Sequence, residues 1–177
     1  GVEGLEPWDE AFAAERLRNA RFDLDSEELR PYFPLPRVLE GLWEATRRLY
    51  GVKVRETGND AVWHPEVRFF EVRDEDGRHL GSFYADFHPR ESKRSGAWMN
   101  GLIHGEPTPA GGLSPHLGIM VCNFTPPQDD QPALLTHREV QTLFHEFGHM
   151  LHHLLSTVEV PALAGTNVPR DWVELPS

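Results

Sequence analysis

Apolar and polar residues repeat with a helical period at both ends of this chain and with a strand period in its middle. Residues 8–19 carry acidic residues early, arginines late and apolar residues at helical spacing: Ala11, Phe12, Ala14 and Leu17. This spacing and this order of charges predict an amphipathic helix.

A second helix is predicted from Val38 to Tyr50, and Gly51 is its expected C-terminal stop. Between the two helices, residues 25–29 predict a short helical turn, and the prolines that follow interrupt the helical pattern. We expect these helices to form an N-terminal helical lobe over residues 1–50.

After Gly51 the apolar period shortens to two, because Val52 and Val54 alternate with charged residues. The runs that follow are rich in β-formers and occupy residues 67–70, 80–87, 97–103 and 117–124. The first two flank the sequence Asp-Glu-Asp-Gly at 74–77, which predicts a β-hairpin. We therefore expect four or five short strands in a β-rich part that spans residues 51–125.

The clearest pattern lies at residues 136–155. Thr136 and Glu139 have the spacing of a capping box, and apolar residues then recur every three or four positions: Val140, Leu143, Phe144, Phe147, Leu151 and Leu154. This predicts a helix with one buried face. A further helix is expected to start within residues 170–177.

Helices followed by strands and then by another helix are typical of an α+β layer architecture, not of alternating βαβ units. We predict N-terminal helices and a small, mostly antiparallel sheet, with the helix of residues 136–155 packed on that sheet. The length of 177 residues suits a single segment with its own core.

The composition argues against several classes of partner. The formal net charge is −11, whereas proteins that bind nucleic acid carry a basic patch, so we expect no nucleic-acid partner. The chain has no apolar run of membrane-spanning length, so we expect no membrane partner. The chain has one cysteine, Cys122, in an apolar run that predicts a buried, unreactive thiol. With one cysteine and no signal-like N-terminal pattern, a cytoplasmic location is expected.

The chemistry is concentrated in His145-Glu146-Phe147-Gly148-His149, which matches H-E-x-x-H. On a helix, His145 and His149 project from one face about 6 Å apart, so both imidazoles can reach one zinc ion, while Glu146 can reach a bound water. Gly148 costs about 1 kcal/mol relative to alanine inside a helix, and such a cost usually marks close packing or function.

A catalytic zinc takes a third protein ligand. The spacing alone leaves three downstream carboxylates open, namely Glu159, Asp171 and Glu174. Glu174 is favoured because it follows a helix-like start that could pack antiparallel to the H-E-x-x-H helix. The alternative is that Asp171 and Glu174 only cap that short helix.

The remaining histidines carry no predicted ligand role. His153 would lie about 12 Å along the helix axis from His145, too far to share one ion, so His152 and His153 are interpreted as supporting or surface groups. The others show no ligand spacing and are expected to be solvated or satisfied in the core: His64, His79, His88, His104, His116 and His137.

Residues 144–149, together with Asp171-Trp172-Val173-Glu174-Leu175-Pro176-Ser177, resemble the M3 family of zinc oligopeptidases, the thimet oligopeptidase and oligopeptidase A group. The similarity continues upstream through residues 60–70, 81–84, 93–99, 121–124 and 132–135. This resemblance implies a zincin-like catalytic core with one zinc ion per chain. It also implies that Glu174 is the third zinc ligand, since it occupies the glutamate position of the family's V-E-x-P-S motif.

The same resemblance implies an endopeptidase that hydrolyses short peptides through a zinc-activated water, with Glu146 as the general base. Gly96, Ala97 and Trp98 resemble the edge strand that zinc peptidases offer to an extended peptide, although an ordinary sheet edge with a buried tryptophan is an equal alternative. Peptide deformylase also uses H-E-x-x-H, with a cysteine as third ligand. It is disfavoured because the chain has no Glu-Gly-Cys sequence.

Members of that family are longer helical proteins, so we expect this chain to be a catalytic-core fragment. The rival to an active enzyme is a folded zinc-binding fragment that is catalytically silent. The surfaces that such a core exposes would favour self-association.

Overall fold

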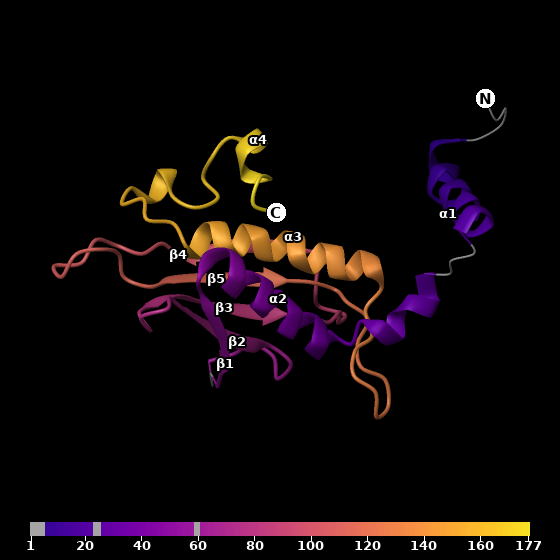
Figure 1. Ribbon diagram of the computed structural model, residues 1–177, viewed down its shortest axis with the longest axis horizontal. Coiled ribbons are helices and arrows are strands. Elements are labelled where there is room, and N and C mark those ends of the chain that lie inside the picture. The colour runs from indigo at the N-terminus through magenta and orange to yellow at the C-terminus, as the bar shows by residue number, and fades with distance from the viewer. Residues whose placement is uncertain (1–5, 23–25, 59–60) are drawn as a thin grey trace.

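The computed structural model describes residues 6–22, 26–58 and 61–177 (Figure 1). Asp25 and Asp60, which belong to the predicted helical turn and to one of the family-like segments, lie outside these ranges. In chain order, the elements are η1 (Pro7–Asp9), α1 (Glu10–Phe22), η2 (Ser26–Tyr32), α2 (Leu35–Tyr50), β1 (Lys53–Thr57), β2 (Arg68–Arg73), β3 (His79–Asp86), β4 (Trp98–Ile103), β5 (His116–Val121), α3 (His137–Leu154), η3 (Pro161–Leu163) and α4 (Arg170–Val173).

The strands form one five-stranded sheet in the order β1-β2-β3-β5-β4. Three of the four pairings are antiparallel, and β3 pairs with β5 in parallel. The predicted hairpin is confirmed as β2 and β3, which join through the turn that contains Gly77 at a positive φ of 84°. The chain is therefore a mixed α+β structure with a mostly antiparallel sheet, as expected.

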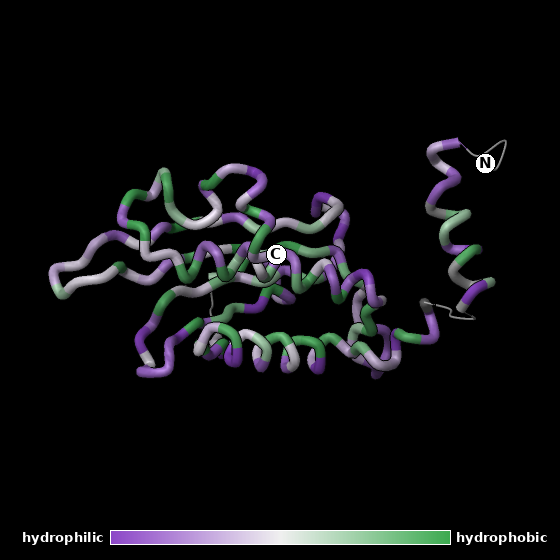
Figure 2. The backbone as a smooth tube through the Cα atoms, turned by 45° about the horizontal axis from the view of Figure 1, so that its top comes forward, coloured by the Kyte–Doolittle hydropathy of each residue, from purple (hydrophilic) through white to green (hydrophobic). Residues whose placement is uncertain are grey.

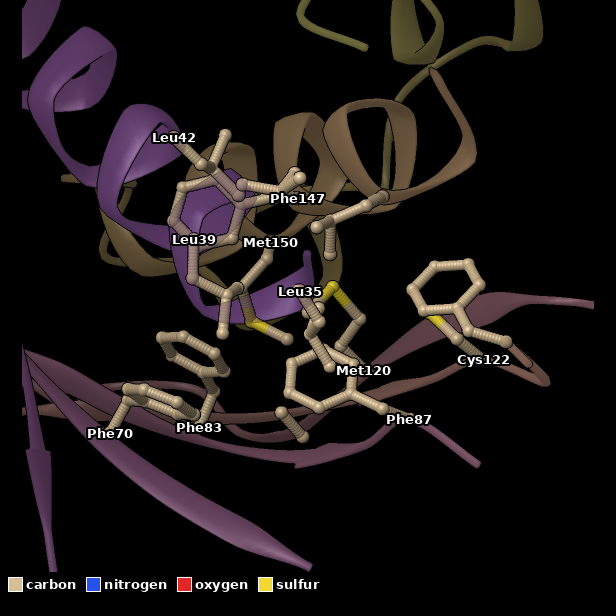
Figure 3. Packing of buried hydrophobic residues seen from close by; sticks show 14 of the residues in the cluster. Leu35, Leu39, Leu42, Phe70, Phe83, Phe87, Met120, Cys122, Phe147 and Met150 are labelled. Carbon is tan, nitrogen blue, oxygen red and sulfur yellow. The ribbon is translucent and has the colours of Figure 1, made fainter. Parts of the chain in front are cut away.

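Helices α2 and α3 cover one face of this sheet (Figure 3). Leu39 and Leu42 of α2 and Phe147 and Met150 of α3 point toward aromatic side chains of the sheet. The rings of Phe70 and Phe83 stack with their centroids 5.0 Å apart beneath these helices. At about 25 cal/mol per Å² of apolar surface, this shared burial is the main force that fixes α3 on the sheet.

Helices α1 and α2 differ in their relation to the sheet. Helix α2 shows turns that alternate between hydrophobic and hydrophilic residues (Figure 2), and its hydrophobic side belongs to the core of the sheet. Helix α1 packs on η1 and stands apart from the sheet in both views. The amphipathic pattern marked both helices but did not show which of them reaches the core.

Helix α2 begins at Leu35, three residues earlier than predicted, because Pro36 occupies its first turn. A proline is tolerated there, since the first N–H groups of a helix have no intrahelical acceptor. Gly51 ends the helix as predicted, with φ of 67° and its N–H bonded to the carbonyl of Arg47.

Within the described part of the chain, no helix is both long enough and apolar enough to cross a membrane.

Candidate metal centre

Helix α3 is fixed at its N-terminus by the predicted capping box. The Thr136 hydroxyl accepts a hydrogen bond from the N–H of Glu139 at 3.1 Å, and the Glu139 carboxylate accepts one from the N–H of Thr136 at 2.7 Å. The same carboxylate accepts the N–H of Thr125 at 2.8 Å, which ties the helix start to the segment after β5. The rotation of α3 about its axis is thereby set by both its cap and its buried face.

That rotation turns His145 and His149 toward Glu174 of the C-terminal segment. The imidazole rings of His145 and His149 lie with centroids 4.7 Å apart, and their Nε2 atoms are 3.5 Å and 3.3 Å from Oε2 of Glu174. One ligand atom from each of the three residues lies within 4.8 Å of the other two. Phe144, predicted on the buried face, is instead 42% exposed, because that face follows Leu143 and Phe147.

The C-terminal segment that carries Glu174 lies directly against α3 at Gly148 (Figure 1). A Cβ atom on Gly148 would overlap the carbonyl oxygen of Pro176 and lie 2.6 Å from Cα of Ser177. Ser177 in turn donates its hydroxyl to the Glu174 carboxylate at 3.1 Å. The glycine inside the helix therefore has a packing role. It allows the C-terminal segment, which carries the third candidate ligand Glu174, to approach the helix backbone.

The capping alternative for Glu174 is not what the structure shows. The N-cap of α4 is Pro169, no side chain caps that helix, and Glu174 occupies its C-cap. Asp171 and Glu159 are both exposed, and neither belongs to a metal-binding group among the described residues.

The donor set and its spacing fit zinc. For tetrahedral zinc with bonds of about 2.0–2.1 Å, two ligand atoms lie about 3.3–3.4 Å apart, since the edge of a tetrahedron is about 1.6 times the bond length. The two Nε2 to Oε2 distances of 3.3 and 3.5 Å match this edge. They are longer than a typical hydrogen bond between the same atoms.

Glu146 is buried, with 7% of its surface exposed, beside the two histidines. Burial raises the pKa of its carboxyl, and nearby Glu174 adds to the rise, whereas His145 and His149 oppose it. A carboxylate with a raised pKa is suited to take up a proton during a reaction. Cys122 is fully buried, as predicted, and burial raises the pKa of its thiol far above the usual value, which disfavours the reactive thiolate.

Among the described residues, the second ring nitrogen of His149 lacks the hydrogen bond that would hold the ring in place. Nδ1 of His149 is buried and has no hydrogen-bond partner there, although metal-bound histidines usually donate this second N–H to a carboxylate or carbonyl. The side chains of His145 and Glu174 are 46% and 54% exposed, so this centre is open to solvent.

The predicted peptide-binding residues lie at the edge of the sheet. Trp98 begins β4, which is the edge strand next to β5, and Gly96 and Ala97 precede it. The carbonyl of Gly96 already accepts a hydrogen bond from the Asn123 side chain, at 2.6 Å. Trp98 and Ala97 are both half-buried, and most of β4 is exposed.

Strand β4 also reaches the metal centre. A hollow of about 170 Å³ is lined by Met99 of β4 together with His149, Thr166, Val173 and Glu174. The edge strand and two of the candidate ligands, His149 and Glu174, therefore border one space.

Sequence reasoning missed a second group of histidines. The sequence predicts no ligand role for His104, His116 or His153, yet one ring nitrogen from each lies within 4.8 Å of the others. His116 and His153 are 4% and 0% exposed. No spacing in the sequence signals this group, because a loop, a strand and a helix bring its members together.

Comparisons with known proteins give one family. A family model described as peptidase family M3 matches residues 1–177. Oligopeptidase A of Salmonella typhimurium is 47% identical over 178 residues, which cover 100% of this chain and 26% of that protein.

Oligopeptidase A of Escherichia coli is 46% identical, with the same coverage of both chains. Dipeptidyl carboxypeptidase of Escherichia coli is 45% identical over 97% of this chain and 25% of its own length. The chain thus spans about a quarter of the length of these curated relatives.

Proposed function

Because the chain belongs to peptidase family M3, we propose that it is the zinc-binding core of a metalloendopeptidase that hydrolyses internal bonds of short peptides. The observation that carries this proposal is the convergence of His145, His149 and Glu174 beside the buried carboxyl of Glu146. The names of the homologous oligopeptidases support short peptides as the substrate class. The α+β layers with the H-E-x-x-H helix on the sheet support a zincin-like fold.

In this proposal, Nε2 of His145, Nε2 of His149 and a carboxylate oxygen of Glu174 hold one zinc ion. The ion, when bound, would supply a Lewis acid for the scissile carbonyl and would lower the pKa of a bound water to about 7. Gly148 keeps Glu174 in place by admitting residues 176 and 177 against the helix.

Glu146 acts as the general base. Its carboxylate takes the proton of the attacking water and then delivers that proton to the nitrogen of the departing amine. Burial of Glu146 favours its protonated form, which eases the first of these transfers.

Strand β4 is proposed to bind the substrate backbone. It is an edge strand whose outer side pairs with no other strand of the described sheet, so an extended peptide could add to it through main-chain hydrogen bonds. Asn123 supports this edge by fixing the carbonyls of Arg94 and Gly96 just before the strand. Trp98, Ala97 and Gly96 would then contact the peptide near the start of β4.

A second candidate is a folded zinc-binding fragment with little or no catalysis. It is favoured by the exposure of His145 and Glu174, since a water-filled site weakens the electrostatic stabilisation on which hydrolysis depends.

We also propose a cellular location and self-association of the chain. A cytoplasmic location is proposed from the single cysteine, which is buried as a free thiol. Self-association is proposed from large apolar side chains that lie exposed near the C-terminal end: Leu163, Trp172 and Leu175.

The test is hydrolysis of a quenched short peptide by the zinc-loaded chain, compared with chelator-treated protein and with Glu146→Gln. Chelator-sensitive cleavage that Glu146→Gln abolishes supports the peptidase, because the amide keeps the shape of the side chain but cannot take a proton. Cleavage by Glu146→Gln at more than a few per cent of the parent rate would show that Glu146 is not the base.

A further inference from the structure

A second cluster of metal-ligating side chains lies between α3 and the edge of the sheet. His104 directly follows β4, His116 begins β5, and His153 lies in the last turn of α3. The imidazole rings of His104 and His153 are perpendicular, with centroids 4.7 Å apart, and the ring of His116 lies 5.4 Å from that of His153. One nitrogen from each ring lies within 4.8 Å of the other two, a spacing that the described residues show in only one other group, the metal centre above.

The sheet is shaped to receive the His153 ring. Gly101 of β4 pairs with Gly118 of β5, and both glycines face this imidazole. A Cβ atom at Gly101 would lie 2.7 Å from Cε1 and 2.9 Å from Nδ1 of His153, and one at Gly118 would lie 3.4 Å from its Cδ2. Gly101 therefore makes room for a histidine at a fully buried position, where an apolar residue would otherwise be expected, while Gly118 beside it makes room for Met150.

Hydrogen bonds fix the tautomers of two rings. Nε2 of His153 lies 2.9 Å from the carbonyl of Leu117, and Nε2 of His116 lies 3.0 Å from the carbonyl of Ser156. A carbonyl only accepts, so both Nε2 atoms carry the proton and both Nδ1 atoms present a lone pair. Donation of the second N–H to a backbone carbonyl is the usual arrangement of histidines that bind a metal.

Two of the nitrogens in the cluster lack a partner. Nδ1 of His153 and Nδ1 of His104 are buried and make no hydrogen bond within the described residues. The carbonyl of Ile103 also faces the His153 ring but does not meet hydrogen-bond geometry. A buried polar atom without a partner is unfavourable, so two of them in one cluster indicate a ligand that supplies the missing interaction.

We propose that His104, His116 and His153 form a second metal site, which takes a divalent transition-metal ion of the zinc type. Neutral imidazole nitrogens are preferred ligands of such ions. Burial lowers the pKa of His116 and of His153, which favours the neutral form that binds metal. With three protein ligands, the ion keeps a fourth position for water.

Filling this site requires one exchange. Nδ1 of His116 accepts the N–H of Gly105 at 3.0 Å, and a bound ion would replace that hydrogen bond. Gly105 adjoins His104 at the start of the loop that joins β4 to β5, so the exchange involves the segment that also carries a ligand. The ion would tie this loop and the sheet edge to the C-terminal turn of α3, the helix that holds His145 and His149.

The experiment counts zinc in a background without the first site, the double variant His145→Ala, Glu174→Ala. After gel filtration in chelator-scrubbed buffer, elemental analysis is expected to find about one zinc per chain in this background. Adding His104→Ala is expected to remove it, whereas adding the matched control His64→Ala is expected to leave it bound. His104 is only half-buried and His64 lies outside the cluster, so both variants preserve the core. A background that binds no zinc, or a His104→Ala variant that retains it, overturns the proposal.

A second measurement is independent of the variants in the cluster. In the same double-variant background, added zinc is expected to move the ¹⁵N chemical shift of Nδ1 of His153 from the value of an unprotonated nitrogen to that of a metal-bound one. The chemical shift of the Gly105 amide is expected to change as well. An unchanged Nδ1 signal at saturating zinc contradicts the site. Because the background lacks His145 and Glu174, these results do not depend on whether the chain is a peptidase.

Discussion

Glu174 is the one candidate ligand of the first centre that does not come from α3, so zinc affinity there depends on a residue held by tertiary packing. In a His104→Ala background, which silences the second cluster, Glu174→Ala is expected to weaken zinc binding by at least about 100-fold. Competition with a chelator of known affinity measures this change.

The matched control is Glu159→Ala, which removes the same charge from an exposed position outside the metal group. Its zinc affinity should equal that of the parent. Full affinity in Glu174→Ala would refute the third-ligand assignment.

At the scale of residues, the sequence predicted His145, Glu146 and His149 because helical spacing alone brings them together. Spacing left three carboxylates open for the third ligand, and only the resemblance to a family singled out Glu174. The grouping of His104, His116 and His153 could not be predicted, because it depends on β4 and β5 pairing and on α3 crossing them.

At the scale of elements, α3 carries a glycine in its interior where a helix alone would favour alanine by about 1 kcal/mol. Gly148→Ala is expected to leave the metal-free protein folded, but to displace residues 176 and 177 and to lower zinc affinity about 10–100-fold. Zinc titration and urea unfolding of the metal-free protein separate these two effects.

Gly41→Ala is the control on the other core helix, because a Cβ there meets nothing within 4 Å. It should raise the free energy of unfolding by about 0.5–1 kcal/mol without changing zinc affinity. Unchanged zinc affinity in Gly148→Ala would show that the contact with the C-terminal segment does not position Glu174.

The pattern of apolar residues predicted the hairpin of β2 and β3 and the capped helix α3, because those features are local. It did not predict that β5 inserts between β3 and β4, since the parallel pairing of β3 with β5 depends on how the connecting segment crosses the sheet. That insertion places β4 at the edge, beside the metal centre.

At the scale of the whole molecule, a buried ion network secures this crossing. Asp86 at the end of β3 accepts hydrogen bonds from Arg90 and from Lys93, and its backbone carbonyl accepts the N–H of Cys122. Burial would raise the pKa of Asp86, but the hydrogen bonds from Arg90 and Lys93 outweigh it and lower the pKa from 3.8 to about 2.

This shift makes the fold sensitive to acid. The unfolded chain protonates Asp86 at a higher pH than the folded chain does, so its contribution is present above about pH 4 and is lost as the pH falls toward 2. The contribution is about 2 kcal/mol at neutral pH. Unfolding of the metal-free protein between pH 5 and pH 2 should therefore show a shallower loss of stability in Asp86→Asn than in the parent.

Glu44→Gln is the comparison for this prediction. The pKa of Glu44 is also lowered, to about 2, by hydrogen bonds from Arg47 and Arg48, but its side chain is 43% exposed and solvent screens its ion pairs. Its pH profile should follow that of the parent. If Asp86→Asn keeps the acid dependence of the parent, the buried network is not its source.

The openness of the first centre also sets an expectation for the rate. With His145 and Glu174 about half exposed and Nδ1 of His149 unsupported, the zinc-loaded chain is expected to cleave short peptides at least about 100-fold more slowly than an intact oligopeptidase A. Steady-state turnover of both proteins on one quenched peptide measures the ratio. Comparable rates would mean that His145, Glu146, His149 and Glu174 suffice.

The most direct test of the proposed centre is an anomalous difference map of zinc-soaked crystals, collected on both sides of the zinc absorption edge. We expect a peak at about 2.0–2.2 Å from Nε2 of His145, Nε2 of His149 and a carboxylate oxygen of Glu174. A map with no peak between these three residues, or with a peak that Glu174 does not contact, would contradict it.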